Sequence, residues 1–246
     1  MNTVRRYISE KQAEIGHHPF FARLEGQAAF ESTMDFVAGM TFWVFVFQDV
    51  LRLNEARMVD PVLGRIARHH RSEDRGHDAW FLEDLAELDP SPRDYRWLFG
   101  QHHAQTRDAA YALVSEVFRA SDDHVRILLL LTLESAGHVF FERSAEFVSL
   151  HGADKSLRYF SSRHLEVEKD HSMFEAEMMK PLDVELSPTV QAEALAMVDR
   201  CYAAFDLLFS GLESRLVRRA SGNLSVPAPA NRPGSDPDTG GAAEPH

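Results

Sequence analysis

Apolar positions recur with helical spacing along most of this chain. Between Ser32 and Ala220 glycine and proline are rare, and apolar residues return every three or four positions, as on the buried face of a helix. No stretch alternates apolar and polar residues as a half-buried strand does. The pattern predicts helices over residues 2–16, 32–52, 61–88, 101–119, 122–150, 162–180 and 187–220. We therefore expect an all-α protein, a bundle of seven to eight helices.

Individual segments sharpen this prediction. Residues 32–52 are apolar on nearly every side, which is typical of a helix at the centre of a bundle. Pro61 is well placed in the first turn of the third helix, and Ser187 with Pro188 is well placed to begin the last. From residue 221 the chain is rich in proline and glycine and has almost nothing to bury. We expect a folded domain over residues 1–220 and a disordered tail over 221–246.

Composition narrows the function. The chain has 246 residues with 26 basic and 38 acidic side chains, a net charge of −12, and no basic stripe. We therefore expect neither nucleic acid nor an anionic membrane surface as a partner. The apolar stretch 40–47 is too short to span a bilayer, and the N-terminus has no signal-peptide pattern. The single cysteine, Cys201, permits no internal disulfide and no thiolate cluster. We expect a cytoplasmic protein.

The strongest local motif is HLEVEKDH, residues 164–171. On a helix, His164 and Glu168 are about 40° apart and His171 lies about 20° to the other side, so all three project from one face. Two imidazoles and a carboxylate are ligands that suit iron, manganese or zinc. The alternative is a polar helix face in solvent, and the motif alone does not decide between them.

A second polar cluster, HHRSEDRGHD, spans residues 69–78. If residues 61–88 are one helix, His70, Glu73 and His77 share a face, with Asp74 on its edge. Apolar residues on either side make this patch an interruption of a core-directed stripe. We predict Glu73 and His77 as ligands; the family resemblance described below implies that His70 or Asp74 could replace Glu73. A polar turn at the surface is the alternative.

A third element places one carboxylate in an apolar helix. Glu134 lies within LLLLTLESAGHVFF, residues 128–141, and a buried carboxylate is costly unless it is paired or binds a metal. We expect Glu134 to be a ligand. His138, one turn later on the same face, is expected to support the ligands or to line a pocket. A buried Glu–His hydrogen bond is the alternative.

The order and spacing of these elements resemble the haem-oxygenase-like diiron oxidases. The resemblance covers about residues 15–180, including HPFFARLEG, EDRGHDAWFLEDL, ESAGHVFF and HLEVEKDH. It implies a haem-oxygenase-like helical bundle, two iron ions, and O2 as co-substrate. It also implies that the six iron ligands are Glu73, His77, Glu134, His164, Glu168 and His171. The chain departs from the family pattern at Glu168, where aspartate is usual.

The function implied is an O2-dependent non-haem diiron oxidase or oxygenase in specialised metabolism. Its substrate would be a small amino acid, amine or fatty acid, and an electron donor and a homodimer are further expectations. We expect one wall of an apolar substrate pocket to include Phe36, Met40 and Trp43. Three alternatives stay open. The first is a haem-binding or haem-degrading protein with His17 or His18 as axial ligand. The second is a metal-free relative, such as a thiaminase-like enzyme using Cys201, and the third is a protein with no catalytic role.

Overall fold

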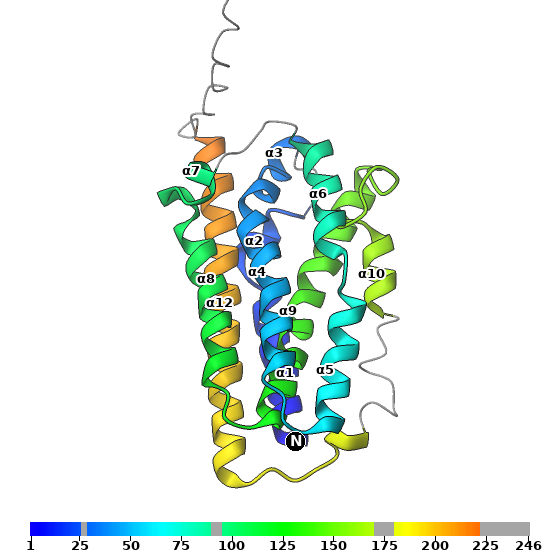
Figure 1. Ribbon diagram of the computed structural model, residues 1–246. Coiled ribbons are helices and arrows are strands. Elements are labelled where there is room, and N and C mark those ends of the chain that lie inside the picture. The colour runs from blue at the N-terminus through cyan, green and yellow to red at the C-terminus, as the bar shows by residue number, and fades with distance from the viewer. Residues whose placement is uncertain (26–28, 90–94, 170–179, 222–246) are drawn as a thin grey trace, which may run out of the picture.

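The computed structural model describes residues 1–25, 29–89, 95–169 and 180–221, and over these ranges the chain contains helices and no strand (Figure 1). The all-α prediction is confirmed. The predicted tail, except Ser221, and the end of the predicted 162–180 helix lie outside the described residues. The helices are α1 (Asn2–Ile15), α2 (Pro19–Ala22), α3 (Phe30–Thr33), α4 (Phe36–Ala56), α5 (Pro61–Glu73), α6 (His77–Leu88), α7 (Tyr95–Leu98), η1 (Gln101–His103), α8 (Ala104–Arg119), α9 (Asp123–Leu150), α10 (Ser162–Lys169), η3 (Lys180–Leu182) and α12 (Pro188–Ala220).

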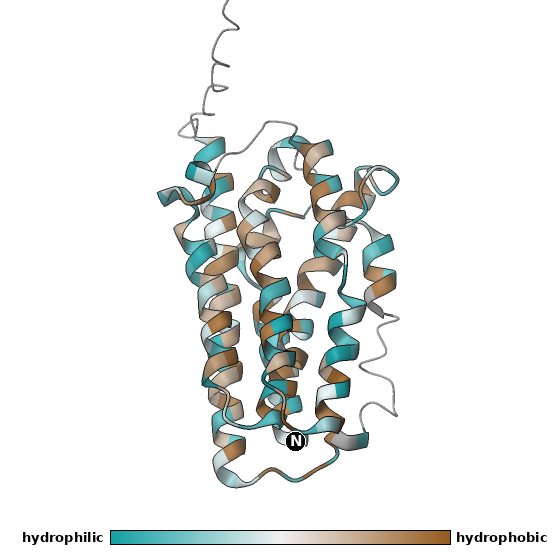
Figure 2. Ribbon diagram, in the orientation of Figure 1, coloured by the Kyte–Doolittle hydropathy of each residue, from teal (hydrophilic) through white to brown (hydrophobic). Residues whose placement is uncertain are grey.

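The long helices form a bundle with α4 and α9 in its middle (Figure 1). Helices α8 and α12 lie on one side of this pair, and α5, α6 and α10 lie on the other. Helix α1 packs against α9 and α12. In Figure 2 the visible side of α5 is largely hydrophilic, whereas brown apolar residues recur along α4 and α12. The core therefore lies between the helices, around α4 and α9.

Two of the helices begin at residues whose side chains cap the helix N-terminus. The Asp60 carboxylate accepts hydrogen bonds from the backbone N–H groups of Val62 and Leu63, and Pro61 occupies the first turn of α5. Ser187 accepts from Val190 N, and Pro188 begins α12. Both predicted starts are confirmed.

The predicted single helix over residues 61–88 is wrong. The structure divides it into α5 and α6 at Gly76, which has φ of 97°. This left-handed backbone is readily adopted by glycine but is strained for other residues. The chain therefore turns between Asp74 and His77, and the side chains on either side no longer follow one helical register.

Two helices, α4 and α9, are long and apolar enough to cross a membrane by length and composition alone. In this bundle 56% of the apolar window of α4 and 67% of that of α9 are buried against other parts of the chain. Central helices of a packed bundle have this character. The expectation of a protein outside the membrane stays a prediction.

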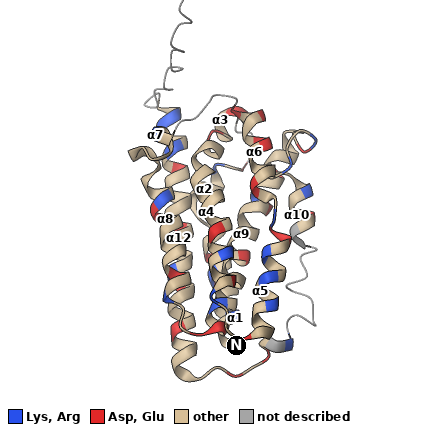
Figure 3. Cartoon of the chain, viewed as in Figure 1, with Lys and Arg blue, Asp and Glu red and all other residues tan. Residues whose placement is uncertain are grey.

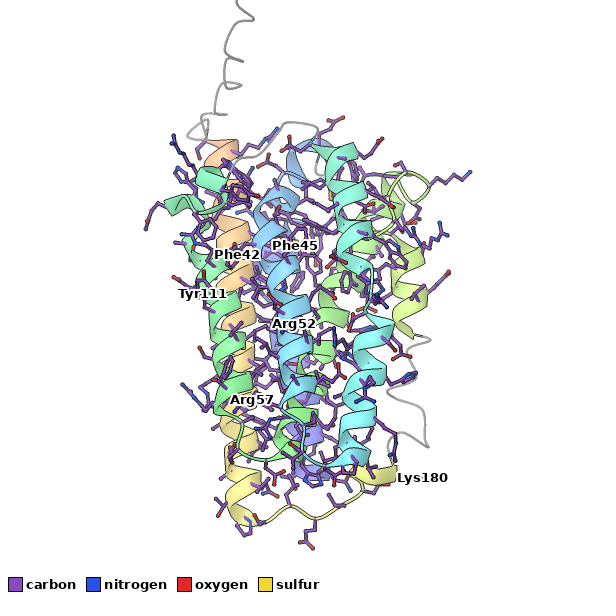
Figure 4. All side chains as sticks on the ribbon, viewed as in Figure 1. Phe42, Phe45, Arg52, Arg57, Tyr111 and Lys180 are labelled. Atoms are coloured by element: carbon purple, nitrogen blue, oxygen red, sulfur yellow. The ribbon has the colours of Figure 1, made fainter. Side chains whose placement is uncertain are left out.

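Aromatic side chains also lie on the outer side of α4 and α8. Phe45 and Tyr111 are 40% and 49% exposed, and the rings of Phe42 and Tyr111 are 5.4 Å apart (Figure 4). Exposed aromatic surface of this kind is buried when proteins associate. It is compatible with the expected homodimer, which stays a prediction.

Candidate metal centre

Three ligand-type side chains converge where α5 ends beside α9. His70 Nε2 lies 2.7 Å from Glu134 Oε1 and 3.3 Å from Asp74 Oδ2. One ligand atom from each of these residues lies within 4.8 Å of the other two. His70 is fully buried and Asp74 is 4% exposed. A nitrogen and two carboxylate oxygens thus share a small buried volume.

The cluster continues through two further histidines. His77 Nδ1 lies 3.3 Å from Asp74 Oδ1 and 3.3 Å from His164 Nε2. His77 begins α6, and His164, which is fully buried, lies in the first turn of α10. Four segments of the chain therefore contribute to one connected set of imidazoles and carboxylates. We call these five residues the ligand cluster: His70, Asp74, His77, Glu134 and His164.

The donor set of the ligand cluster fits a divalent metal ion. Ligand atoms that share an ion at about 2.1 Å are roughly 3 Å from one another, close to the separations of 2.7 and 3.3 Å found here. Imidazole nitrogen with carboxylate oxygen is the chemistry of iron, manganese and zinc sites. Asp74 Oδ2 is buried and accepts no hydrogen bond from the described residues, as expected of an oxygen that meets a cation.

Glu73 lies to one side of this cluster. Its Oε1 is 3.3 Å from Nε2 of His69, one helical turn earlier, and its side chain is 16% exposed. The break at Gly76 explains the difference from prediction, because His77 no longer continues the register of α5. His70 and Asp74, the two residues named as substitutes for Glu73, are the ones beside Glu134. The assignment of Glu73 as a ligand stays a prediction.

Two of the six predicted ligands are not described. The backbone of Glu168 belongs to α10, but its side chain lies outside the described part of the structure, as does all of His171. The structure therefore brings His77, Glu134 and His164 together from the predicted set. It adds His70 and Asp74, and it says nothing about the side chains of Glu168 and His171.

Aromatic rings enclose the histidine end of the cluster. The His164 ring lies 4.2 Å from that of Phe141, 4.9 Å from Tyr159 and 5.6 Å from Trp80, measured between centroids. His164 Nδ1 lies 2.7 Å from the carbonyl oxygen of Tyr159. A carbonyl only accepts, so Nδ1 carries the hydrogen and the lone pair is on Nε2, which faces His77. This tautomer suits a metal ligand.

A cavity beside the cluster contains about 660 Å³ of space between atoms, part of it open to solvent. Asp74, His77 and Glu134 line it at one side, and most of the remaining wall is apolar. Met40 and Trp43 line it as predicted. Phe36 does not, because its ring packs in the core against Phe20, Phe140 and Phe160. The other lining residues are Val44, Phe47, Gln48, Leu133, Gly137, His138, Phe140, Phe141, Tyr159, Phe205, Leu208 and Phe209.

His138 separates this cavity from the outside. It lines the cavity, and it also lines a wide surface groove with Gln12 and His17 of the N-terminal region and Glu142 and Arg143 of α9. His138 is predicted to support the ligands or to line a pocket, and the structure places it in the wall of both hollows.

Asp84, a buried residue of α6, is not among the predicted site residues. Its Oδ1 accepts a hydrogen bond from Arg158 N at 2.7 Å, and its Oδ2 accepts from Tyr159 N at 2.8 Å and Phe160 N at 3.0 Å. Burial raises the pKa of the Asp84 carboxyl, while these three backbone donors oppose the rise. Asp84 thus holds the segment that leads into α10. An aspartate within the apolar run FLEDL was the available signal.

The residues required by the alternative functions are placed elsewhere. His18 Nδ1 accepts from Phe20 N at the start of α2, and its Nε2 faces Ser210 Oγ at 3.3 Å, while His17 is exposed. Cys201 is fully buried near Met197 and is not among the residues that line the cavity. Burial raises the pKa of the Cys201 thiol, which disfavours a nucleophilic thiolate.

The charge distribution agrees with an interior site. In Figure 3 blue and red residues lie mainly on outer faces and at helix ends, and α5 shows several blue residues on the side toward the viewer. Arg68 and Arg71 of α5 pair with Glu55 at the surface, at 3.0 and 2.7 Å. The ligand cluster instead brings carboxylates together with imidazoles inside the bundle.

The geometry thus defines a class of protein, an all-helical bundle with a buried histidine–carboxylate cluster at the edge of an apolar cavity. No protein-family model matches the chain. None of the curated proteins matches it either.

Proposed function

We propose that this protein is a non-haem diiron oxidase or oxygenase of the haem-oxygenase-like kind, which uses O2 to oxidise a small, largely apolar molecule. One observation carries the proposal: Glu134, His70, Asp74, His77 and His164 are linked by contacts of 2.7–3.3 Å at the wall of an apolar cavity. Buried polar groups that are joined in this way and open onto a pocket are a typical active-site arrangement.

The ligand cluster offers donors for two ions. His70, Asp74 and Glu134 would hold one iron. His77 and His164 would belong to the second, together with Glu168 and His171, which the motif HLEVEKDH supplies. When bound, ferrous iron supplies electrons for the reduction of O2 and is oxidised. Two carboxylates from the described residues would offset part of the positive charge of two divalent ions.

The protein side chains around the cluster would bind the substrate and limit water. Met40, Trp43 and Phe205 give the cavity an apolar wall, whereas Gln48, His138 and Tyr159 supply polar groups outside the cluster. No lysine or arginine is among the described residues that line it. This composition favours a substrate with an apolar body, such as an aromatic or aliphatic amine or amino acid.

The proposal is tested by loading the protein with Fe(II) without air and counting bound iron. We expect close to two irons per chain and a transient visible absorption band when O2 is admitted. Glu134→Ala should lose bound iron, since it removes a ligand from the centre of the cluster. Glu146→Ala is the matched control, because Glu146 is an exposed glutamate later on the same helix, α9, and its loss should leave the iron content unchanged.

The results of the iron-loading experiment distinguish the proposed function from its alternatives. A chain that binds no iron and acts without it contradicts the proposal. Binding of haem with a shifted Soret band in place of Fe(II) favours the haem-binding alternative. Equal iron content in Glu134→Ala and in the unchanged protein shows that iron is bound elsewhere.

A further inference from the structure

A path of hydrogen bonds links a buried carboxylate of α6 to a histidine of the ligand cluster. Asp84 is 1% exposed and accepts three backbone hydrogen bonds from residues 158–160. The carbonyl oxygen of the middle residue, Tyr159, accepts from His164 Nδ1 at 2.7 Å. Asp84 itself is not a member of the cluster and is not among the residues lining the cavity.

The direction of each hydrogen bond is fixed by chemistry. Backbone N–H groups only donate, so the carboxylate accepts at both of its oxygens, and this sets the orientation of the peptide planes around Tyr159. The Tyr159 carbonyl only accepts, so His164 must carry its hydrogen on Nδ1. The lone pair is then on Nε2, the atom 3.3 Å from His77 Nδ1.

We infer that Asp84 is a positioning residue for the metal centre: it fixes residues 158–160 so that the Tyr159 carbonyl holds His164 in the orientation and tautomer that bind metal. This inference rests on the proposed function and concerns the same site. Residues that hold a histidine ligand through its second nitrogen raise metal affinity, and their loss costs about 10- to 100-fold.

Other contacts of the segment do not replace Asp84. The Arg158 guanidinium stacks over the Trp80 ring at 4.0 Å and lies 3.7 Å from Glu83, whose side chain is 62% exposed. Exposed ion pairs of this kind contribute little. Ser161 Oγ donates to the Arg158 carbonyl at 3.1 Å, a contact within a few residues of sequence. Asp84 accepts from three backbone N–H groups of the segment from a position 74–76 residues away in sequence.

The substitution Asp84→Asn tests the inference with little change in volume. The amide has one acceptor oxygen, and its NH2 group must face at least one backbone N–H. We expect the dissociation constant for Co(II), titrated without air, to rise about 10-fold. Glu83→Gln is the matched control, since it is the neighbouring exposed carboxylate that also approaches Arg158, and it should leave Co(II) affinity unchanged.

A double-mutant cycle with His164 distinguishes positioning from general destabilisation. If Asp84 acts through His164, the pair Asp84→Asn and His164→Ala should bind Co(II) no more weakly than His164→Ala alone. A loss of affinity on Asp84→Asn that is the same in both backgrounds overturns the inference. So does Co(II) affinity in Asp84→Asn equal to that of the unchanged protein.

The tautomer of His164 gives a readout that does not depend on metal. In the metal-free protein, nitrogen chemical shifts of the imidazole should report hydrogen on Nδ1, and in Asp84→Asn both tautomers should be populated. An unchanged tautomer in a folded Asp84→Asn protein overturns the inference. If the unchanged protein binds no Co(II), both the proposed function and the metal role of Asp84 are contradicted. If the losses of Co(II) affinity caused by Asp84→Asn and His164→Ala are additive, only the role of Asp84 is contradicted.

Discussion

The two sides of the bundle are built differently. On one side α8 and α12 run uninterrupted for 16 and 33 residues and pack along each other. On the other side α5 and α6 are 13 and 12 residues long and are separated by the turn at Gly76. The site lies where these two helices and the first turn of α10 meet the central helix α9.

Buried carboxylates also have different partners on the two sides of the bundle. Between α8 and α12, Glu116 accepts two hydrogen bonds from the Arg200 guanidinium, at 2.8 and 2.7 Å. Such a bidentate pair satisfies the carboxylate within the protein. On the other side Asp74 and Glu134 face the imidazole of His70. Unlike a guanidinium, an imidazole is not a permanent cation, so these carboxylates suit a site for cations.

The two sides of the bundle differ in how their helices position side chains. A continuous helix places residues in a fixed periodic pattern, which serves core packing but limits which side chains can converge. After the break at Gly76, His77 at the start of α6 lies 3.3 Å from both Asp74 Oδ1 of the preceding turn and His164 Nε2 of α10. The regular side therefore stabilises the bundle, and the interrupted side positions the ligand cluster.

The largest expected effect is a loss of stability on the side formed by α8 and α12. Leu113 of α8 is 1% exposed, and Leu113→Ala should lower the free energy of unfolding by about 2–5 kcal/mol, because it removes buried methyl groups and leaves a cavity. Urea unfolding measures the loss. The exposed neighbour Ser115→Ala should change stability by less than about 0.5 kcal/mol. Metal bound per folded Leu113→Ala molecule should stay the same; a loss of bound metal would contradict the separation of roles.

A smaller effect is expected at the break itself. Gly76 has φ of 97° and open space around the position of a Cβ atom, so Gly76→Ala meets backbone strain and no clash. We expect unfolding free energy to fall by about 1–2 kcal/mol and Co(II) affinity to weaken, since the turn places Asp74 and His77. Gly76→Asn should be milder in both measurements, because asparagine tolerates this conformation better. Increased stability in Gly76→Ala would show that the turn is not needed.

The elements of the fold were predictable because local signals agree with burial. The apolar spacing of residues 122–150 and 187–220, the first-turn proline Pro61 and the cap Ser187 all act within a few residues of sequence. The break at Gly76 was missed because HHRSEDRGHD has no apolar periodicity that could show a change of register. A glycine inside a polar helical run gives no sign of its φ angle.

The candidate site was predictable only in part, because contacts between distant parts of the chain decide which side chains converge. His77, Glu134 and His164 were found because their polar character stands out against apolar neighbours. The choice among His70, Glu73 and Asp74 depended on where α5 ends, which is a tertiary result. Phe36 was assigned to the pocket wall from its helix alone, yet its ring turns toward Phe20 and Phe140. Asp84 escaped notice because its partners are backbone groups of residues 158–160.

The smallest expected effect distinguishes a structural histidine from those of the cluster. His18 is 8% exposed and caps α2 through Nδ1, while Ser210 and Asp206 of α12 lie 3.3 and 3.7 Å from its Nε2. Burial lowers the pKa of His18 below its ordinary value of about 6.5, against the opposing charges of Asp206 and Glu213. The neutral imidazole is therefore the form that the folded protein favours.

The sign of the pH dependence follows from proton binding. Below about pH 6.5 the unfolded chain takes up a proton at His18 that the folded chain resists, so stability is lost as pH falls from 6.5 through the lowered folded pKa. His18→Asn keeps an oxygen that can cap α2 but does not titrate. Between about pH 7.5 and about pH 5.5, urea unfolding should show a smaller loss of stability in His18→Asn than in the unchanged protein. Metal binding should be the same in both proteins, since His18 caps a helix away from the ligand cluster. Equal pH dependence of stability in the two proteins would contradict the burial of a neutral His18. Altered metal binding in His18→Asn would place His18 in the site.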